Sequence, residues 1–498
     1  MKARFFIVLI AAFLQEGGLL GREVEESDFY RLDTYSLPQD LKLEVSGLAL
    51  LPAGEMAIAI RKGEVWVLKD VDDLESPSFQ RFADGLHEPL GLAYHQGDLY
   101  VVQRTEMTRL VDRNQDGVAD EYRTIAKGWG VTGNYHEYAY GPVFDHDGQA
   151  WLTLNCSIGA GTHPNDNLWR GWSMRVDRKG ALHPVSGGLR SPSGLGVNLF
   201  GDVFATDQQG NWFPTCCLIH LQPGVFHGHA DALRFTDQPG STFRVEERIP
   251  QDLSVVEAAE QIDAYRLPAV WFPYRKMGMS ATDILCDTTE GGFGPFSGQL
   301  FVGEFTQSFV SRVFLEKVNG VYQGACFRFR DGLQSAALRL AWTANGNMLV
   351  GQTNRGWNSL GGRSFGLQRI APTGRVPFEI ISMEARSKGF SLLFTQALDA
   401  KSLANPQWIK MTSYTYPYHQ AYGGEEIEKQ TLSVDGISLS EDRRKLDLRV
   451  TGLRAGFVHE LDASVLRSET GSSLLHAQAY YTLNEIPQRL SLKGGGQE

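Results

Sequence analysis

Short runs of apolar residues, interrupted by glycine turns, recur along most of the chain. Each unit has an apolar strand, a turn ending in glycine, a second apolar or aromatic strand, a polar loop and a third strand. The turn glycines are Gly54, Gly97, Gly148, Gly201, Gly298 and Gly346, which are 43, 51, 53, 97 and 48 residues apart. A period of about 50 residues with three or four strands per unit is typical of β-propeller blades. The pattern predicts an all-β chain with a six-bladed β-propeller over residues 41–374, preceded by an N-terminal extension over residues 22–40.

Two stretches depart from this repeat. Residues 230–279 include the charged sequence RVEERIPQDLSVVEAAEQIDAYRL and lack the strand–glycine–strand plan, so we interpret them as an insertion. Over residues 377–487, short alternating runs such as FEIISMEA and KLDLRVTG occur without the turn-glycine repeat. This second pattern predicts a small β-sandwich of the immunoglobulin or fibronectin type, and residues 488–498 are expected to form a disordered tail.

Residues 1–21 have the pattern of a secretory signal peptide. Two cations stand in the first four residues, and an unbroken apolar run follows from Phe5 to Leu14. A run of about 10 residues is too short to cross about 30 Å of hydrocarbon, and no later stretch reaches about 18 apolar residues. We therefore expect cleavage after Gly21, a periplasmic or secreted protein, and no transmembrane span in the mature chain; an uncleaved anchor is the alternative.

Composition narrows the classes of partner. Lys and Arg number 47 against 58 Asp and Glu, and the resulting net charge of −11 repels phosphate backbones, so nucleic acid is not an expected partner. The five cysteines are odd in number and predict no disulfide framework. The sequence has no CxxCH motif, so a covalently bound haem is not expected. The adjacent Cys216 and Cys217 are expected to be buried on a strand, with a strained redox-sensitive ring as the alternative.

Polar residues next to the predicted inner strands are the first candidates for chemistry. The segment Gly133–Pro142 carries His136, flanked by Asn134 and Glu137. An imidazole that titrates near neutrality beside a carboxylate is a competent general base. The alternative is a histidine that only satisfies backbone groups of its loop.

Arginines at the predicted blade mouths form a second set. Arg190 lies in the turn Gly188–Gly196 ahead of the fourth blade, and Arg61 and Arg339 stand at equivalent mouths. A guanidinium over the channel binds a carboxylate or quinone oxygen, and three of them would form a cationic pocket in an acidic protein. An inter-blade salt bridge is the alternative for Arg190.

The sequence DRNQDGVADEY resembles a calcium-binding loop. Positions one, three, five and nine are occupied by Asp112, Asn114, Asp116 and Asp120. Gly117 permits a sharp turn, and alternate oxygen ligands around a glycine suit Ca²⁺. The glutamate at position twelve of an EF-hand is absent, since Arg123 stands there, so we predict a shorter Ca²⁺ loop; a solvated acidic turn is the alternative.

Three segments together resemble the soluble quinoprotein glucose and sorbosone dehydrogenases, which are six-bladed propellers. The segments are HEYAYGPVFDHDGQAWLT, RSPSGLGVNLFGDVFATDQQG, and LRLAWTANGNMLVGQTN with GLQRI. The resemblance spans Leu41 to Thr373 and is nearest to the divergent, planctomycete-type branch whose members are described as membrane-bound dehydrogenases. Two departures stand out: Ser191 replaces the usual Asn, and the loop from Asp207 to Trp212 lacks the family's proline-bearing segment, whose backbone oxygens help to hold the cofactor calcium.

The resemblance implies a function and assigns roles to the candidates. His136 matches the base that takes the substrate hydroxyl proton, Arg190 and Arg339 match residues that contact pyrroloquinoline quinone, and Arg61 matches less closely. The implied reaction is hydride transfer from an aldose, or a related sugar or aldehyde, to a quinone polarised by Ca²⁺ and arginine. Electrons would then pass to an external acceptor such as a cytochrome c or a copper protein.

Two other functions stay open on the same fold. One is a non-catalytic secreted propeller that binds glycans or protein partners, with Trp129, Tyr135, Trp212 and Trp357 as the expected aromatic lining of the channel mouth. The other is a calcium-dependent lactonase, which the scarcity of acidic residues at the blade mouths disfavours.

Overall fold

Strands dominate the fold in this computed structural model, which describes residues 24–159, 168–246 and 248–488. The predicted signal peptide lies outside the described residues, as do residues 489–498 of the predicted tail. Within the described part, the one α-helix is α1 (Val255–Gln261), and the 3-10 helices are η1 (Glu26–Asp28), η2 (Ala230–Phe235), η3 (Ala400–Leu403) and η4 (Pro406–Trp408). None of these helices is long and apolar enough to span a membrane.

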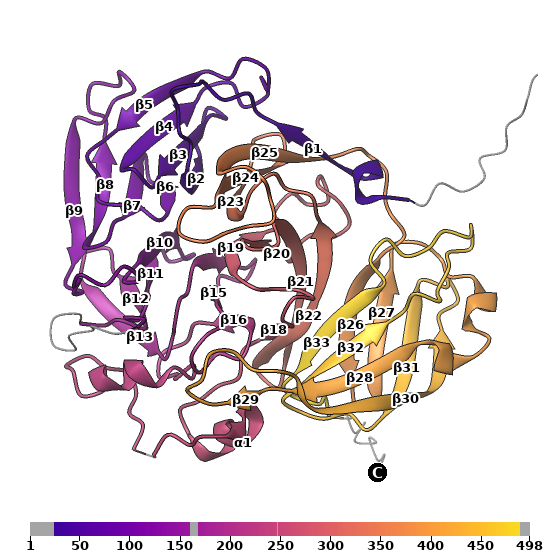
Figure 1. Cartoon of the computed structure of the whole chain (residues 1–498). Coiled ribbons are helices and arrows are strands. Elements are labelled where there is room, and N and C mark those ends of the chain that lie inside the picture. The colour runs from indigo at the N-terminus through magenta and orange to yellow at the C-terminus, as the bar shows by residue number, and fades with distance from the viewer. Residues whose placement is uncertain (1–23, 160–167, 247, 489–498) are drawn as a thin grey trace, which may run out of the picture.

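Five four-stranded antiparallel sheets stand around a central axis in a propeller arrangement (Figure 1). Two are formed by β2 (Val45–Leu50), β3 (Met56–Ile60), β4 (Glu64–Leu68) and β5 (Phe79–Ala83), and by β6 (Leu92–His95), β7 (Asp98–Val102), β8 (Glu106–Val111) and β9 (Glu121–Lys127). The next two are formed by β10 (Ala139–Phe144), β11 (Ala150–Leu154), β12 (Trp172–Val176) and β13 (Leu182–Gly187), and by β14 (Gly194–Val197), β15 (Val203–Asp207), β16 (Cys216–His220) and β18 (Val270–Phe272). The fifth consists of β23 (Ala337–Trp342), β24 (Met348–Thr353), β25 (Phe365–Pro372) and β1 (Tyr30–Thr34).

Burial explains why the second strands of the sheets are apolar runs without alternation. Strands β3, β11, β15 and β24 are buried along their whole length, because each packs between the sheets on both sides. Two strands come from outside the expected repeat. β1, from the predicted N-terminal extension, pairs with β25, and β18, from the predicted insertion, pairs with β16.

The sixth expected unit is part of a larger sheet. Strands β19 (Ala281–Cys286), β20 (Leu300–Glu304), β21 (Phe309–Val318) and β22 (Val321–Arg330) pair in chain order at the head of an eleven-stranded sheet. The innermost strands β2, β6, β10, β14, β19 and β23 contact one another in that order, and β23 contacts β2. The ring of inner strands is therefore closed.

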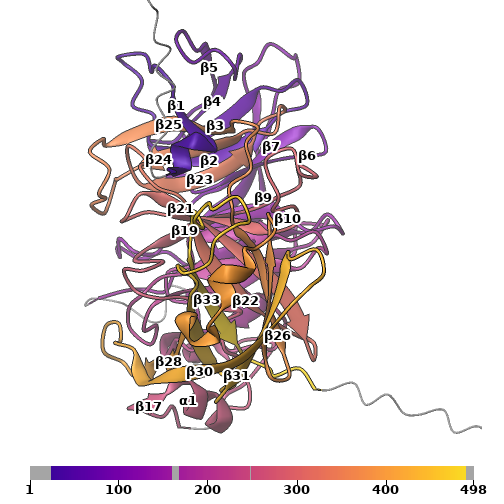
Figure 2. The ribbon, with the colours of Figure 1, turned by 90° about the vertical axis from the view of Figure 1, so that its right-hand side faces the viewer.

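The C-terminal strands continue this large sheet. Beyond β22 the order is β33 (Gln478–Leu483), β32 (Phe457–Asp462), β28 (Lys410–Thr415), β30 (Ile427–Leu439), β31 (Lys445–Thr451), β27 (Gly389–Phe394) and β26 (Ile380–Arg386). Gly324 of β22 pairs with Thr482 of β33, and Ala325 and Phe327 share the apolar core of the C-terminal strands. Figure 2 shows these strands packed along one side of the propeller. The region predicted as a sandwich is thus joined to the propeller by a shared sheet and core.

Candidate functional site

A cavity of about 500 Å³ opens at one face of the propeller. His136, Arg190 and Arg61 all line it, although 129 residues separate the first and last of them in the chain. Antiparallel strands reverse direction at each turn, so the link into each inner strand and the loop after each second strand open on the same face. His136 and Arg190 lie in links ahead of β10 and β14, and Arg61 follows β3. The fold therefore brings the three side chains together.

The Arg190 loop is held by a buried carboxylate. Asp207, at the end of β15, accepts hydrogen bonds from the backbone N–H groups of Arg190, Ser191 and Gln208, each at 2.7 Å. Burial raises the pKa of Asp207 to about 6, and the three N–H donors oppose that rise. We did not predict this role from the sequence. The only signal was the Asp within the TDQQG segment that follows the strand.

The guanidinium group of Arg190 is buried and has no carboxylate partner. The residue is only 6% exposed, and among the described residues its guanidinium makes no hydrogen bond or ion pair. Its Cζ lies 5.4 Å from the ring centroid of Tyr422, and a Cβ added at Gly210 would fall 1.8 Å from its Nε. A buried, unpaired charge is costly, so this guanidinium gives the cavity a positive potential and a free donor group for an anion.

His136 presents a neutral imidazole to the cavity. Its backbone N–H is bonded to Asn134 Oδ1 at 2.9 Å, whereas its ring nitrogens have no hydrogen-bond partner among the described residues. Burial, reinforced by the charges of Arg190 and Arg104, lowers the pKa of His136. The neighbouring Glu137 carboxylate accepts hydrogen bonds from Thr132 and Ser157 and thereby holds the loop. At neutral pH the imidazole is thus available to accept a proton.

Arg61 lines the cavity but shares its charge with protein groups. It forms an ion pair with Glu88, donates to the carbonyl of Arg355 at 2.8 Å, and donates to the Tyr138 hydroxyl at 3.2 Å. Glu88 also bonds Arg104 at 2.7 Å. Burial works against the Glu88 charge, but the two guanidinium groups hold its pKa below the ordinary value.

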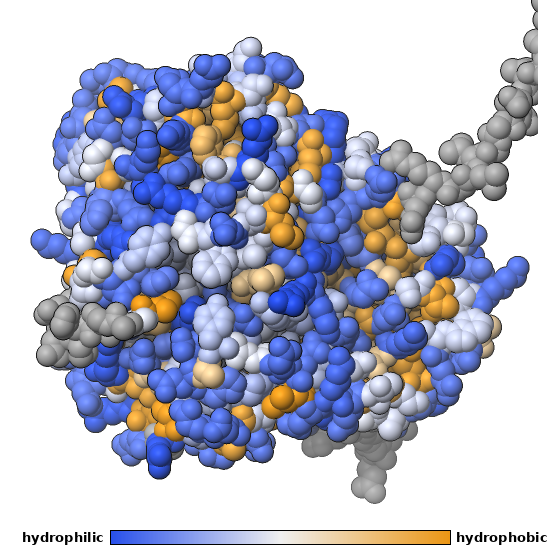
Figure 3. Space-filling model, in the orientation of Figure 1, coloured by the Kyte–Doolittle hydropathy of each residue, from blue (hydrophilic) through white to orange (hydrophobic). Residues whose placement is uncertain are grey.

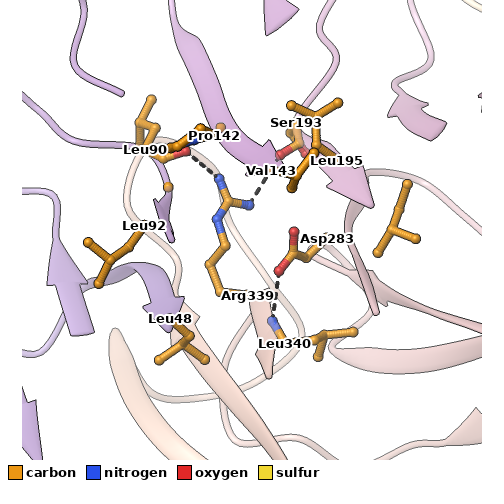
Figure 4. A pocket seen from close by; sticks show the side chains of 13 residues that line it. Leu48, Leu90, Leu92, Pro142, Val143, Ser193, Leu195, Asp283, Arg339 and Leu340 are labelled. Atoms are coloured by element: carbon orange, nitrogen blue, oxygen red, sulfur yellow. Dashed lines mark hydrogen bonds between the residues drawn. The ribbon is translucent and has the colours of Figure 1, made fainter. Parts of the chain in front are cut away.

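Arg339 lies in the central channel, outside this cavity. Figure 4 shows its side chain in the small pocket of about 130 Å³ that it lines with Leu90 and Ser193. The guanidinium donates to the carbonyls of Ser46 at 2.9 Å, Leu90 at 2.9 Å, Ser193 at 3.1 Å and Leu338 at 2.8 Å. All of its nitrogens are therefore engaged, and Arg339 links inner strands across the channel. The structure does not bring it together with His136 and Arg190.

The predicted calcium loop lies between β8 and β9, whose turn opens on the face opposite to the cavity. Its carboxylates bond its own backbone: Asp112 accepts from the N–H of Gly117 at 2.8 Å, and Asp120 accepts from the N–H of Arg113 at 2.8 Å. Asn114 and Asp116 make similar local contacts. Within residues 24–159, 168–246 and 248–488 no group of three His, Cys, Asp or Glu side chains could hold a metal. The calcium prediction is therefore unsupported.

Exposed aromatic side chains surround the mouth of the cavity. Tyr135, Trp357 and Tyr422 line it and are 50%, 65% and 63% exposed. Two expected members of this lining are buried elsewhere: the Trp129 indole donates to the Arg104 carbonyl at 2.7 Å, and the Trp212 ring lies 5.0 Å from that of Tyr418. Tyr422 was missed because it belongs to the C-terminal region.

Surface and cysteine chemistry add little to the site. On the face of Figure 3, hydrophobic residues form small groups scattered among hydrophilic ones. Cys156, Cys216, Cys217, Cys286 and Cys326 are all free and buried. The adjacent pair lies on β16 as two separate thiols, in agreement with the simpler of the two interpretations.

Comparison with protein families identifies one match. The model of a domain of unknown function, DUF7133, matches residues 51–325, which is more than half of the chain. The chain belongs to this family. His136, Arg190 and Arg61 fall inside the matched DUF7133 domain, whereas Arg339, Trp357 and Tyr422 lie beyond it. No curated protein matches the sequence.

Solved structures with a similar fold include several sugar dehydrogenases. An oxidoreductase described as a glucose dehydrogenase, from Thermus thermophilus, has 19% identity and a TM-score of 0.48 over 68% of this chain and 99% of that one. The aldose sugar dehydrogenase of Streptomyces coelicolor, in its PQQ-bound form, has 14% identity and a TM-score of 0.48 over 69% and 98%. The apo-form of the Escherichia coli soluble aldose sugar dehydrogenase has 13% identity and a TM-score of 0.45 over 69% and 99%.

Proposed function

We propose that the cavity is the active site of an oxidoreductase that acts on an aldose or a related sugar or aldehyde. The observation that carries the proposal is the placement of His136 and Arg190 on one cavity, the imidazole neutral and unpartnered and the guanidinium buried and unpaired. We also infer that β19–β22 serve as the sixth blade, since β19 stands between β14 and β23 in the ring of inner strands.

In this proposal each side chain has a defined task. His136 accepts the proton of the substrate hydroxyl group as the carbon that bears this hydroxyl is oxidised. The exposed faces of Tyr135 and Trp357 pack against the sugar ring. Glu88 and Tyr138 hold Arg61 in the cavity wall, where it adds positive potential while its two terminal nitrogens stay bonded to protein groups. Arg339 acts as a structural link in the channel and does not touch the ligand.

One residue of the cavity, Arg190, is suited to bind a carboxylate of pyrroloquinoline quinone. The quinone carries ring-borne carboxylates, and the unpartnered guanidinium of Arg190 would hold one of them beside the face of Tyr422. When bound, the quinone supplies the hydride acceptor that the side chains lack. Among the described residues, no group of three His, Cys, Asp or Glu side chains could hold its calcium ion. A cytochrome c or a copper protein outside the cytoplasm is the proposed electron acceptor.

The test is reconstitution and turnover. Purified protein is incubated with pyrroloquinoline quinone, with and without Ca²⁺, and dye reduction is measured with a panel of aldoses and aldehydes. His136→Ala should lower kcat/KM by about 100-fold or more. His146→Ala is the matched control, because His146 is an exposed histidine in the turn between β10 and β11, on the opposite face. The proposal fails if no substrate is oxidised, or if the two variants behave alike.

The pH profile gives a second readout. Because the base must be unprotonated and its pKa is lowered, kcat/KM should be level at neutral pH and fall on acidification only below the ordinary histidine value of 6.5. A profile that still rises above pH 7 would contradict this assignment.

A second function is favoured by the aromatic mouth. Tyr135, Trp357 and Tyr422 would also suit a propeller that binds glycans without turnover. Glycan binding by the cofactor-free protein, with no dye reduction after reconstitution, would identify this alternative.

A further inference from the structure

A segment of the C-terminal region crosses onto the propeller beside the cavity. This bridging segment, residues 417–424, includes β29 (Pro417–Tyr418), which pairs with β17 (Leu253–Ser254) of the propeller insertion. Figure 1 shows it reaching from the C-terminal strands to the neighbourhood of α1. The Tyr418 hydroxyl donates to the carbonyl of Gly228 at 2.6 Å and fixes the start of the segment.

Backbone contacts hold the rest of the bridging segment against the loop that follows β15. The N–H of Trp212 donates to the His419 carbonyl at 3.1 Å, and the N–H of Gly423 donates to the Gly210 carbonyl at 3.0 Å. The Asn211 side chain donates to the Gln420 carbonyl at 2.7 Å. The backbone on both sides of Tyr422 is therefore fixed to the propeller.

This anchoring places Tyr422 beside Arg190. The ring lies 5.4 Å from the guanidinium carbon, lines the cavity, and remains 63% exposed. Asp207, at the end of β15, is occupied by the backbone N–H groups of Arg190, Ser191 and Gln208. One cation without a carboxylate and one open aromatic face thus lie side by side, the first from the propeller and the second from the C-terminal region.

We propose that Tyr422 contacts the ligand and determines specificity, so that the bridging segment and the Arg190 loop form one subsite for a ring compound bearing a carboxylate. The carboxylate would pair with Arg190, and the ring would pack on Tyr422. The quinone cofactor and a sugar acid share this chemistry. The inference rests on the proposed function, because it concerns the same cavity.

Binding is measured on the cofactor-free full chain by isothermal titration calorimetry with pyrroloquinoline quinone, glucuronate and glucose. At least one of the two carboxylate-bearing ligands, pyrroloquinoline quinone or glucuronate, should bind the wild-type protein more tightly than glucose does. Tyr422→Ala should weaken that ligand about tenfold, and Tyr422→Phe should retain most of the affinity because the ring face remains. Arg190→Gln should weaken it on the order of a hundredfold and leave glucose unaffected. Preference for the quinone or for glucuronate identifies the source of the carboxylate.

Trp408→Ala is the matched control, since Trp408 is another exposed aromatic of the C-terminal region and does not line the cavity. It should leave every affinity unchanged. Equal affinity of wild type and Tyr422→Ala for both carboxylates would overturn this inference and leave the proposed oxidoreductase intact. Binding of glucose alone, with no carboxylate preference, would also overturn it. Loss of His136-dependent dye reduction is a separate result that bears only on the proposed function.

Discussion

A buried histidine joins three distant parts of the chain and makes stability depend on pH. The Nε2 of His476 lies 3.0 Å from a carboxylate oxygen of Glu26, and its Nδ1 lies 2.5 Å from one of Glu379. Glu26 precedes β1, Glu379 precedes β26, and His476 precedes β33. Burial opposes the imidazolium charge, but the two carboxylates outweigh it and raise the pKa of His476 from 6.5 to about 9.

The magnitude follows from linkage. A rise in pKa from 6.5 to about 9 corresponds to about 3 kcal/mol of additional stability when the imidazole is charged. Because the folded-state pKa is raised, this contribution is fully present below pH 6.5 and is lost as the pH rises towards 9. His476→Gln should therefore lower the free energy of unfolding by about 3 kcal/mol at pH 6 and by much less above pH 9.

Urea unfolding at pH 6, 7.5 and 9.5 measures this difference. His183→Gln is a suitable control, because His183 forms an exposed pair with Asp177 at 3.0 Å and should change the free energy of unfolding by less than about 0.5 kcal/mol. An effect of His476→Gln that is the same at pH 6 and pH 9.5 would refute the assignment of a charged imidazole. The contacts of His476 with Glu26 and Glu379 matter for the site because they hold the C-terminal region, which carries Tyr422, against the propeller.

Three further substitutions test the cavity and the channel. Gly210→Ala should displace the Arg190 guanidinium, since the new Cβ would fall 1.8 Å from Nε; calorimetry should show carboxylate affinity lowered about tenfold with the melting temperature nearly unchanged. Asp207→Asn leaves one acceptor oxygen for three N–H donors, so urea unfolding should show a loss of about 2 kcal/mol, together with weaker carboxylate binding. Arg339→Met removes the donor from the backbone carbonyls that the guanidinium group bonds in the channel. It should lower the free energy of unfolding by about 3 kcal/mol, while ligand affinity stays the same.

Local patterns in the sequence were enough for the repeating strands and for part of the site. The recurrence of apolar runs and turn glycines encodes hairpins, whose geometry depends on neighbouring residues, and it predicted the propeller arrangement. His136 and Arg190 were found because each stands ahead of an inner strand. In a ring of antiparallel sheets, all such links open on one face.

Only the tertiary structure decided which distant groups meet. A strand pattern carries no record of its pairing partner, so the sequence could not show that β1 closes the last sheet, that β18 completes another, or that β33 extends β22. The sequence also could not show which arginine side chains have protein partners. Arg190 and Arg339 both stand at predicted blade mouths, yet Arg339 is bonded to backbone carbonyls whereas Arg190 lines the cavity. Tyr422 reaches Arg190 from 232 positions away, because long-range backbone pairing, which no local pattern specifies, fixes its segment on the propeller.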